Sequence, residues 1–169
     1  MTTTTHISSA CIISVLAIKS GIDTLEKFLT AAGASFAAHF LLDTIPHGFI
    51  AEPHTIFKKI IPTLLEFCPA LLILGFAIYV FGNPVLFLCA AGFSILPDIV
   101  STLIWKNEKR FSAIPGFLLI HSMHRTVHWF EIDNPDGSVS YRFPGRPLLA
   151  VEAVLIVSFL FFLFKGLNA

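Results

Sequence analysis

The feature that most constrains this chain is the apolar run at residues 84–105, PVLFLCAAGFSILPDIVSTLIW, in which Asp98 is the only charge. A helix needs about 20 predominantly apolar residues to cross the hydrocarbon core of a bilayer. Residues 60–81 and 147–164 meet the same description, each with one glutamate as its only charge. We therefore expect the bilayer, rather than water, to surround these three segments.

The composition agrees with a membrane protein. Apolar residues make up 55% of the chain and charged residues 13%, with a mean hydropathy of +0.80. A water-soluble domain of this size would need more charge to cover its surface. The net charge is zero, so no basic surface argues for a nucleic-acid partner.

Three weaker helical candidates complete the pattern, at residues 6–22, 26–46 and 110–130. The first two are rich in alanine, serine, threonine and glycine, which permit close packing of helices inside a bundle. We predict a single domain over residues 1–169, an all-α integral membrane bundle of five or six helices. The isolated Cys11, Cys68 and Cys89 are expected to be buried free thiols.

Two connections stand out by their length. Residues 131–143, EIDNPDGSVSYRF, place Asn-Pro-Asp-Gly between two short alternating runs, which favours a short β-hairpin near residues 127–143. Residues 47–59, with Pro53 and a lysine pair, are expected to lie along the membrane interface.

The flanking charges predict where the ends of the chain lie. With six spans, more lysines and arginines fall on the side shared by both termini, which favours cytoplasmic termini in a multi-pass protein of the inner (cytoplasmic) membrane. The first apolar segment has no basic residues before it, which predicts a retained segment rather than a cleaved signal peptide.

Ionisable side chains inside the apolar segments are costly in lipid and therefore mark functional positions. His39 and Asp43, in SFAAHFLLDTIPHG, are spaced i, i+4 and share one helix face. Asp98 directly follows Pro97, and proline removes a backbone donor and frees a carbonyl one turn earlier. Imidazoles and carboxylates that come from several helices are a ligand set for a divalent transition metal, and zinc binds both readily.

A stripe of histidines adds to this set in LLIHSMHRTVHWF, residues 118–130. On a helix, His121, His124 and His128 have the spacing i, i+3, i+7 and lie on one face, with Arg125 beside them. The planar guanidinium of Arg125 suits a phosphate group, although simple charge neutralisation of Asp43 or Asp98 would also explain it. Taken singly, each buried histidine is more often a hydrogen-bonded core residue than a ligand.

The segments AAHFLLDTIPHG, SILPDIV and HSMHRTVHW resemble motifs of small bacterial membrane-bound metal-dependent hydrolases. That group includes the LexA-binding, inner-membrane-associated hydrolases and zinc-dependent phospholipase C-like proteins. The motif residues that match in this chain are His6, His39 with Asp43, Pro97 with Asp98, and His124–Arg125 with His128. Val100 stands where the family's Pro-Asp motif has its second acid. The resemblance implies a membrane-embedded hydrolase with a metal site.

The expected activity is metal-dependent hydrolysis of a phosphoester in a lipid or amphiphile, with the membrane giving the substrate lateral access. The expected metal ligands are His39, Asp43, Asp98, His124 and His128. His121 and His6 are expected to complete the site or act as general acid or base, because imidazole titrates near neutrality, and Arg125 to bind the phosphate.

Two other classes of function remain open at this point. A small membrane protein could conduct protons or metal ions along a line of histidine and aspartate, since intramembrane acids and imidazoles mark ion pathways equally well. A non-catalytic protein could use the same residues as a structural metal site or a polar clasp between helices. Glu66 and Glu152 are expected to be structural or interfacial, and His54 to be solvated.

Overall fold

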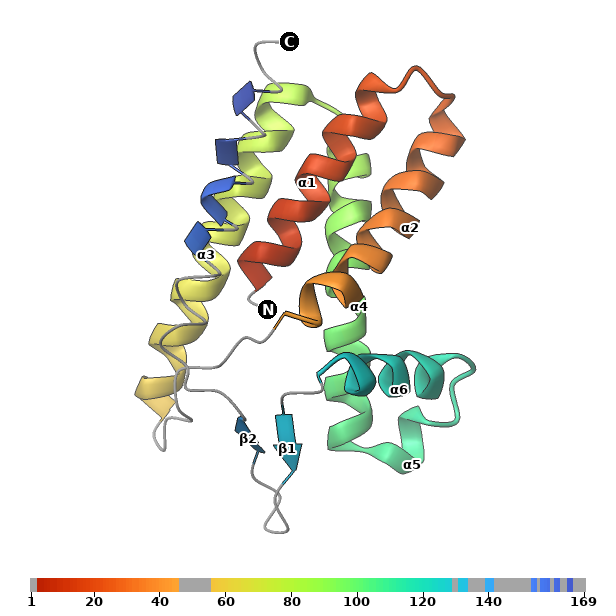
Figure 1. Ribbon diagram of the computed structural model, residues 1–169, viewed down its shortest axis with the longest axis vertical. Helices are drawn as coiled ribbons and strands as arrows, with labels where there is room; N and C mark the ends of the chain where they lie inside the picture. The colour runs from red at the N-terminus through yellow and green to blue at the C-terminus, as the bar shows by residue number, and fades with distance from the viewer. Residues whose placement is uncertain are drawn as a thin grey trace.

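The computed structural model describes residues 3–45, 56–128, 131–133, 139–141, 153–154, 156–158, 160–161 and 164–165. Four long helices come first in the chain (Figure 1): α1 (Thr3–Lys19), α2 (Thr24–Asp43), α3 (Ile56–Phe81) and α4 (Pro84–Lys106). They are followed by α5 (Glu108–Phe111), α6 (Phe117–Val127), β1 (Glu131–Asp133) and β2 (Val139–Tyr141). The helices predicted at residues 6–22, 26–46, 60–81 and 84–105 are present, and the all-α class is confirmed.

The helix ends follow from local sequence. Asp23 caps α2, because its side chain accepts a hydrogen bond of 2.9 Å from the backbone N–H of Glu26. Gly82 (φ 68°) and Asn83 (φ 52°) both adopt left-handed backbone after α3, and Asn83 caps α4 by accepting from the N–H of Leu86. Pro84 then opens α4 at a position where a missing N–H costs nothing. The turn makes α3 and α4 antiparallel neighbours.

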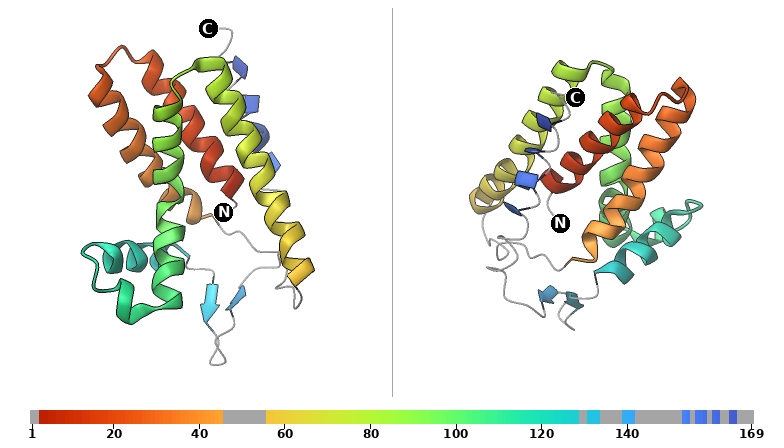
Figure 2. Two further views of the ribbon diagram at one scale, coloured as in Figure 1. Left: turned by 180° about the vertical axis from the view of Figure 1, so that it is seen from behind. Right: turned by 45° about the horizontal axis from the view of Figure 1, so that its top comes forward.

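Helix α1 is the central element, and α2, α3 and α4 all pack against it (Figures 1 and 2). Its small polar residues are buried, and their hydroxyls bond within the helix: Ser8 Oγ donates to Thr4 O at 2.7 Å and Ser14 Oγ to Ala10 O at 2.9 Å. These side chains therefore bring neighbouring backbones close without leaving a buried hydroxyl unsatisfied. The close packing predicted for the first segment is what the structure has.

Two apolar clusters hold the helices together. The larger one joins α1, α3 and α4 through Ile7, Cys11, Val15, Ala70, Ile73, Leu74, Ala77, Phe87 and Ala91. The smaller one joins α1, α2 and α4 through Ala10, Ala17, Ala31, Leu86 and Ala90. All three cysteines are free, but only Cys11 is buried. The predicted burial was wrong for Cys68, which lies exposed on α3, and Cys89 is only partly buried.

Helix α6 lies across the lower half of α4 in Figure 1 and packs against α4 and α2. It has 11 residues, because the turn at residues 112–116 separates it from α5 and Gly116 (φ 84°) begins it. The prediction of a spanning helix over residues 110–130 was therefore wrong, since a helix needs about 20 residues to cross a bilayer. The short α6 packs crosswise against α4 and contacts the C-terminal end of α2.

Among the described residues, one helical stretch is long and apolar enough to cross a membrane, Pro84–Ile104, with 21 residues and a hydropathy of 1.8. Thr3–Lys19 and Phe67–Phe81 are apolar but shorter. Length and composition do not separate a spanning helix from the core helix of a water-soluble protein. The predicted multi-pass bundle therefore stays a prediction.

The remaining segments complete the described structure. Strands β1 and β2 pair antiparallel, with Glu131 opposite Tyr141 and Asp133 opposite Val139, inside the region where a hairpin was predicted. Described parts of the predicted helix 147–164 are helical, and the ring of Phe164 lies 5.7 Å from that of Phe76 on α3. The interfacial placement predicted for residues 47–59 falls largely outside the described residues.

Candidate metal centre

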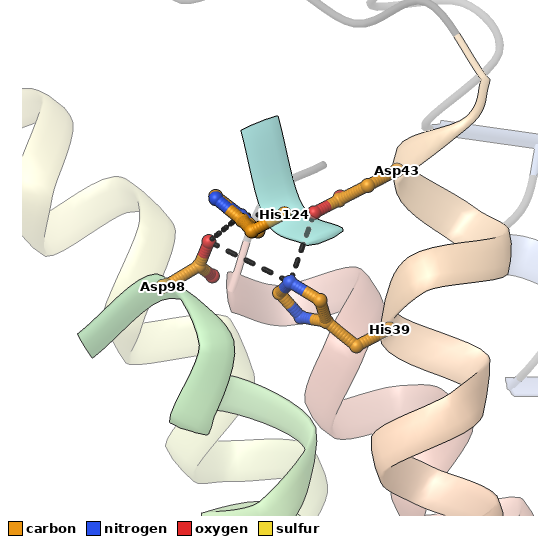
Figure 3. Close-up of side chains that lie close together, drawn as sticks. All are labelled: His39, Asp43, Asp98 and His124. Atoms are coloured by element: carbon orange, nitrogen blue, oxygen red, sulfur yellow. Dashed lines mark hydrogen bonds and ion pairs between the residues drawn. The ribbon is translucent and has the colours of Figure 1, made fainter. Parts of the chain in front are cut away.

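Four side chains from three helices converge beside α4 (Figure 3). They are His39 and Asp43 of α2, Asp98 of α4 and His124 of α6. One ligand atom from each lies within 4.8 Å of all the others. Nitrogen and oxygen ligands that converge in this way form a group that could hold a metal ion, as the sequence predicted.

The individual distances show how closely these atoms approach. His39 Nε2 lies 2.9 Å from Asp43 Oδ2 and 3.8 Å from Asp98 Oδ1. His124 Nε2 lies 2.9 Å from Asp98 Oδ1 and 3.3 Å from Asp43 Oδ2. Each imidazole thus faces both carboxylates, and the four atoms surround a common point.

The local sequence explains why these residues meet. Asp43 lies in the last turn of α2, where Thr44 ends the helix and its hydroxyl donates to Leu41 O at 2.6 Å. His124 lies in the last turn of α6. Two helix C-termini therefore point at the site, and the partial negative charge of a helix C-terminus favours a cation.

Burial is uneven across the group. The side chains of His39 and Asp43 are 0% exposed and that of His124 is 10% exposed, whereas that of Asp98 is 40% exposed. A buried carboxylate costs several kcal/mol unless it is paired. The centre is therefore sealed on the α2 side and open beside Asp98, which is where water or a substrate can approach.

Two more histidines surround Asp43. His6 Nε2 lies 3.2 Å from Asp43 Oδ1, and His128 Nε2 lies 3.0 Å from Asp43 Oδ2. The His6 ring also stacks on that of His39, with centroids 4.2 Å apart. His128, predicted as a metal ligand, thus contacts the shared carboxylate, and His6, predicted as a catalytic residue, is fully buried behind it.

The Nδ1 atoms of the two convergent imidazoles are both held by α4. His39 Nδ1 lies 2.7 Å from the main-chain carbonyl of Ser94, to which it can only donate. That carbonyl lies in the turn before Pro97, whose ring has no N–H and crowds the preceding turn. His124 Nδ1 lies 3.1 Å from Ser101 Oγ. Metal-binding histidines characteristically hold their second nitrogen in this way.

The hydrogen bond from His39 has a consequence for its other nitrogen. In the neutral ring, a proton on Nδ1 leaves Nε2 with a lone pair and no N–H. His39 Nε2 is buried and has no hydrogen-bond partner among the described residues, and the same is true of His6 Nε2. A lone pair and a carboxylate oxygen 2.9 Å apart repel unless a proton or a cation lies between them, so this donor set fits a bound cation.

The surroundings of two histidines of α6 shift their pKa values in opposite directions. Burial lowers the pKa of His124, but hydrogen bonds to Asp43 and Asp98 outweigh it and raise that pKa to about 9. The pKa of His121 is lowered by burial and by the positive charge of Arg125. Without a metal, His124 is therefore a cation between two carboxylates at neutral pH.

The other predicted site residues lie further away or outside the description. Arg125 is exposed on α6, and neither it nor His121 belongs to the four-residue group. His121 is linked to the site through Ser101, whose Oγ lies 2.8 Å from His121 Nδ1. His54, Glu152 and the side chain of Glu66 lie outside the described residues.

Sequence reasoning missed Ser94 and Ser101. A signal was present, because Ser94, Asp98 and Ser101 are spaced i, i+4, i+7 and share one face of an otherwise apolar helix. Comparison of the chain with protein-family models, curated proteins and solved structures finds no match. The family that the motifs resemble therefore stays a prediction.

Proposed function

We propose that this protein is a membrane-embedded metal-dependent hydrolase whose centre binds a divalent cation, zinc, through His39, Asp43, Asp98 and His124. The observation that carries the proposal is the buried Nε2 of His39, which faces two carboxylates without a hydrogen-bond partner among the described residues while Nδ1 is tied to the Ser94 carbonyl. Two imidazoles and two carboxylates match the ligand chemistry of zinc. A catalytic zinc site must also keep one coordination position for water, and the exposed side beside Asp98 would provide it.

A membrane location is supported by the outer faces of the helices. Six large side chains are each at least 60% exposed: Leu25, Leu29 and Leu41 of α2 and Leu71, Leu72 and Tyr79 of α3. Leu25 and Leu29 lie one turn apart on α2, and exposed apolar side chains that cluster in this way mark a surface for membrane or protein contact. Lipid would cover these faces, and the apolar stretch Pro84–Ile104 would cross the bilayer.

The exposed side of the centre supports a hydrolytic role. A bound divalent cation activates water at neutral pH and polarises a phosphoryl oxygen. Asp98 is the partly exposed ligand, so the substrate would enter beside it. Arg125, which is exposed and follows His124 in the chain, would bind the phosphate with its planar fork. His128 hydrogen-bonds one oxygen of Asp43, and the buried His6 ring lies against the other oxygen.

The chemistry of the centre and its surroundings favours a phosphoester in an amphiphile as the substrate class. An apolar outer surface suits acyl chains, and a cation beside an arginine suits the phosphate. A proton- or metal-ion-conducting protein would need a path through the bundle, whereas this centre is sealed by fully buried His6, His39 and Asp43 on its inner side.

The test is metal content together with turnover in the same preparations. Protein purified in detergent is analysed for metals, and hydrolysis of an acylated 4-nitrophenyl phosphoester is followed by absorbance. We expect about one equivalent of zinc or more in the wild type, and loss of both metal and turnover in His39→Ala and Asp98→Asn. Glu108→Gln, which changes an exposed acid on α5, is the control.

Other outcomes would separate the remaining functions. Metal that depends on these residues but without turnover of any phosphoester would point to a structural site. Ion flux in proteoliposomes that is lost in Asp98→Asn would point to conduction. Wild-type protein that binds no divalent metal would refute the proposed centre.

A further inference from the structure

Ser101 is the residue of α4 that lies between two histidines of α6. Its Oγ is 3.1 Å from His124 Nδ1 and 2.8 Å from His121 Nδ1. His124 Nε2, on the opposite edge of the ring, faces Asp98 and Asp43. One hydroxyl therefore connects the metal centre with a partly exposed histidine that does not touch it.

With a metal bound, the hydrogen bonds from His124 through Ser101 to His121 can be arranged in one consistent way. A metal on His124 Nε2 leaves Nδ1 as the protonated nitrogen, so Nδ1 donates to Ser101 Oγ. The hydroxyl has a single hydrogen, which it then donates to His121 Nδ1. Both nitrogens of His124, the hydroxyl of Ser101 and Nδ1 of His121 then each have a partner.

We propose that Ser101 is a positioning residue of the metal centre, which fixes the tautomer and ring orientation of His124 and links it to His121. This inference rests on the proposed metal site. Side chains that hold the second nitrogen of a ligand histidine keep its lone pair aimed at the metal, and their loss lowers metal affinity by about 10- to 100-fold.

Ser94 provides the internal contrast. It lies on the same face of α4 and is fully buried, yet its hydroxyl donates to Ala91 O at 2.8 Å. It holds His39 through its main-chain carbonyl, which any residue would supply. The side chain of Ser101 therefore matters to its histidine, whereas the side chain of Ser94 does not.

The experiment measures Co²⁺ binding to the full chain in detergent, because the visible absorption of Co²⁺ reports both affinity and ligand geometry. The variants are Ser101→Ala, Ser101→Thr and Ser101→Val, with Ser14→Ala, at a buried serine that bonds its own helix, as the matched control. We expect Ser101→Ala and Ser101→Val to bind about 10- to 100-fold more weakly with an altered spectrum. Ser101→Thr keeps the hydroxyl and should stay close to the wild type, as should Ser14→Ala.

Ser101→Thr and Ser101→Val keep the test decisive if Ser101→Ala fails to fold. Threonine and valine have nearly the same shape and differ by a hydroxyl in place of a methyl group. Equal affinity and equal spectra for Ser101→Thr and Ser101→Val would overturn the inference. His124→Gln, titrated in parallel, distinguishes the two proposals. If it loses Co²⁺ while the Ser101 variants keep it, only the role of Ser101 fails, and if all bind as the wild type, the metal centre itself fails.

Discussion

His39 Nε2 and Asp43 Oδ2 lie 2.9 Å apart on successive turns of α2, and this nitrogen has no hydrogen-bond partner among the described residues. Two helical residues spaced i, i+4 commonly approach each other, but a buried pair normally hydrogen-bonds. Here the Ser94 carbonyl holds the proton of the ring on its other nitrogen. A cation bound between this nitrogen and the carboxylate oxygen would complete the arrangement.

Asp43→Asn should remove the metal. The asparagine side chain has nearly the same shape but no charge, and four imidazoles lie within 3.3 Å of the carboxylate oxygens. We expect metal content to fall at least about 10-fold, because a neutral amide is a poor ligand for a divalent cation. Elemental analysis measures it, with Glu26→Gln in the first turn of the same helix as the control. Unchanged metal in Asp43→Asn would exclude Asp43 as a ligand.

The three histidines of the α6 stripe should respond differently to glutamine. His124→Gln should lose the metal, because His124 Nε2 faces both carboxylates. His128→Gln should also lower metal content, through the loss of its contact with Asp43. His121→Gln should lose less, since His121 is not in the four-residue group and is linked to it through Ser101. Each variant is analysed for metal and checked for helix content by circular dichroism. Full metal in both His124→Gln and His128→Gln would show that the stripe is not part of a ligand set.

Arg125→Lys should separate phosphate binding from metal binding. Arg125 is exposed and lies outside the four-residue group, so metal content should not change. Lysine lacks the bidentate fork, and we expect inorganic phosphate to inhibit hydrolysis about 3- to 10-fold more weakly. Inhibition constants measure the effect, and Arg110→Lys, on the exposed surface of α5, is the control. The same inhibition in both variants would place the phosphate elsewhere.

Metal binding at pH 7 should release about one proton, because His124 is charged below its pKa of about 9 and a ligand imidazole must be neutral. The same raised pKa stabilises the metal-free fold fully below about pH 6.5, and this contribution is lost as the pH rises through about 9. Calorimetric titrations of metal in two buffers of different ionisation enthalpy count the protons. Identical heats in the two buffers would contradict the prediction.

The two ends of the chain should lie on opposite sides of the membrane. Six spans would have placed them on one side, but α6 has 11 residues and cannot span. Five candidate segments remain under the proposed membrane location: α1 to α4 and the C-terminal apolar run. Reporter fusions at residue 1 and at residue 169 test the arrangement, with a fusion in the turn before α6 as an internal reference. Two termini on one side would mean that one of these segments does not cross.

The sequence predicted the long helices because apolar runs of that length have few alternatives, and it predicted the site because ionisable groups in such runs are costly. It did not predict the true length of α6, although Pro115 and Gly116 interrupt the pattern. The role of Ser101 could not be distinguished in advance. Most serines in these helices, such as Ser8 and Ser14, bond a carbonyl of their own helix, and only the tertiary contact shows that Ser101 does not.

Helix α4 supplies the Ser94 carbonyl, the Asp98 carboxylate and the Ser101 hydroxyl from two consecutive turns around Pro97. Because all three groups belong to one helix, their positions relative to one another are set by the helical geometry. Inserting or deleting one residue between them would turn one part of the helix by about 100° against the other and separate the supports of His39 and His124. Substitutions on the outer face of this helix would leave the three groups in register. An insertion or deletion between residues 94 and 101 would not.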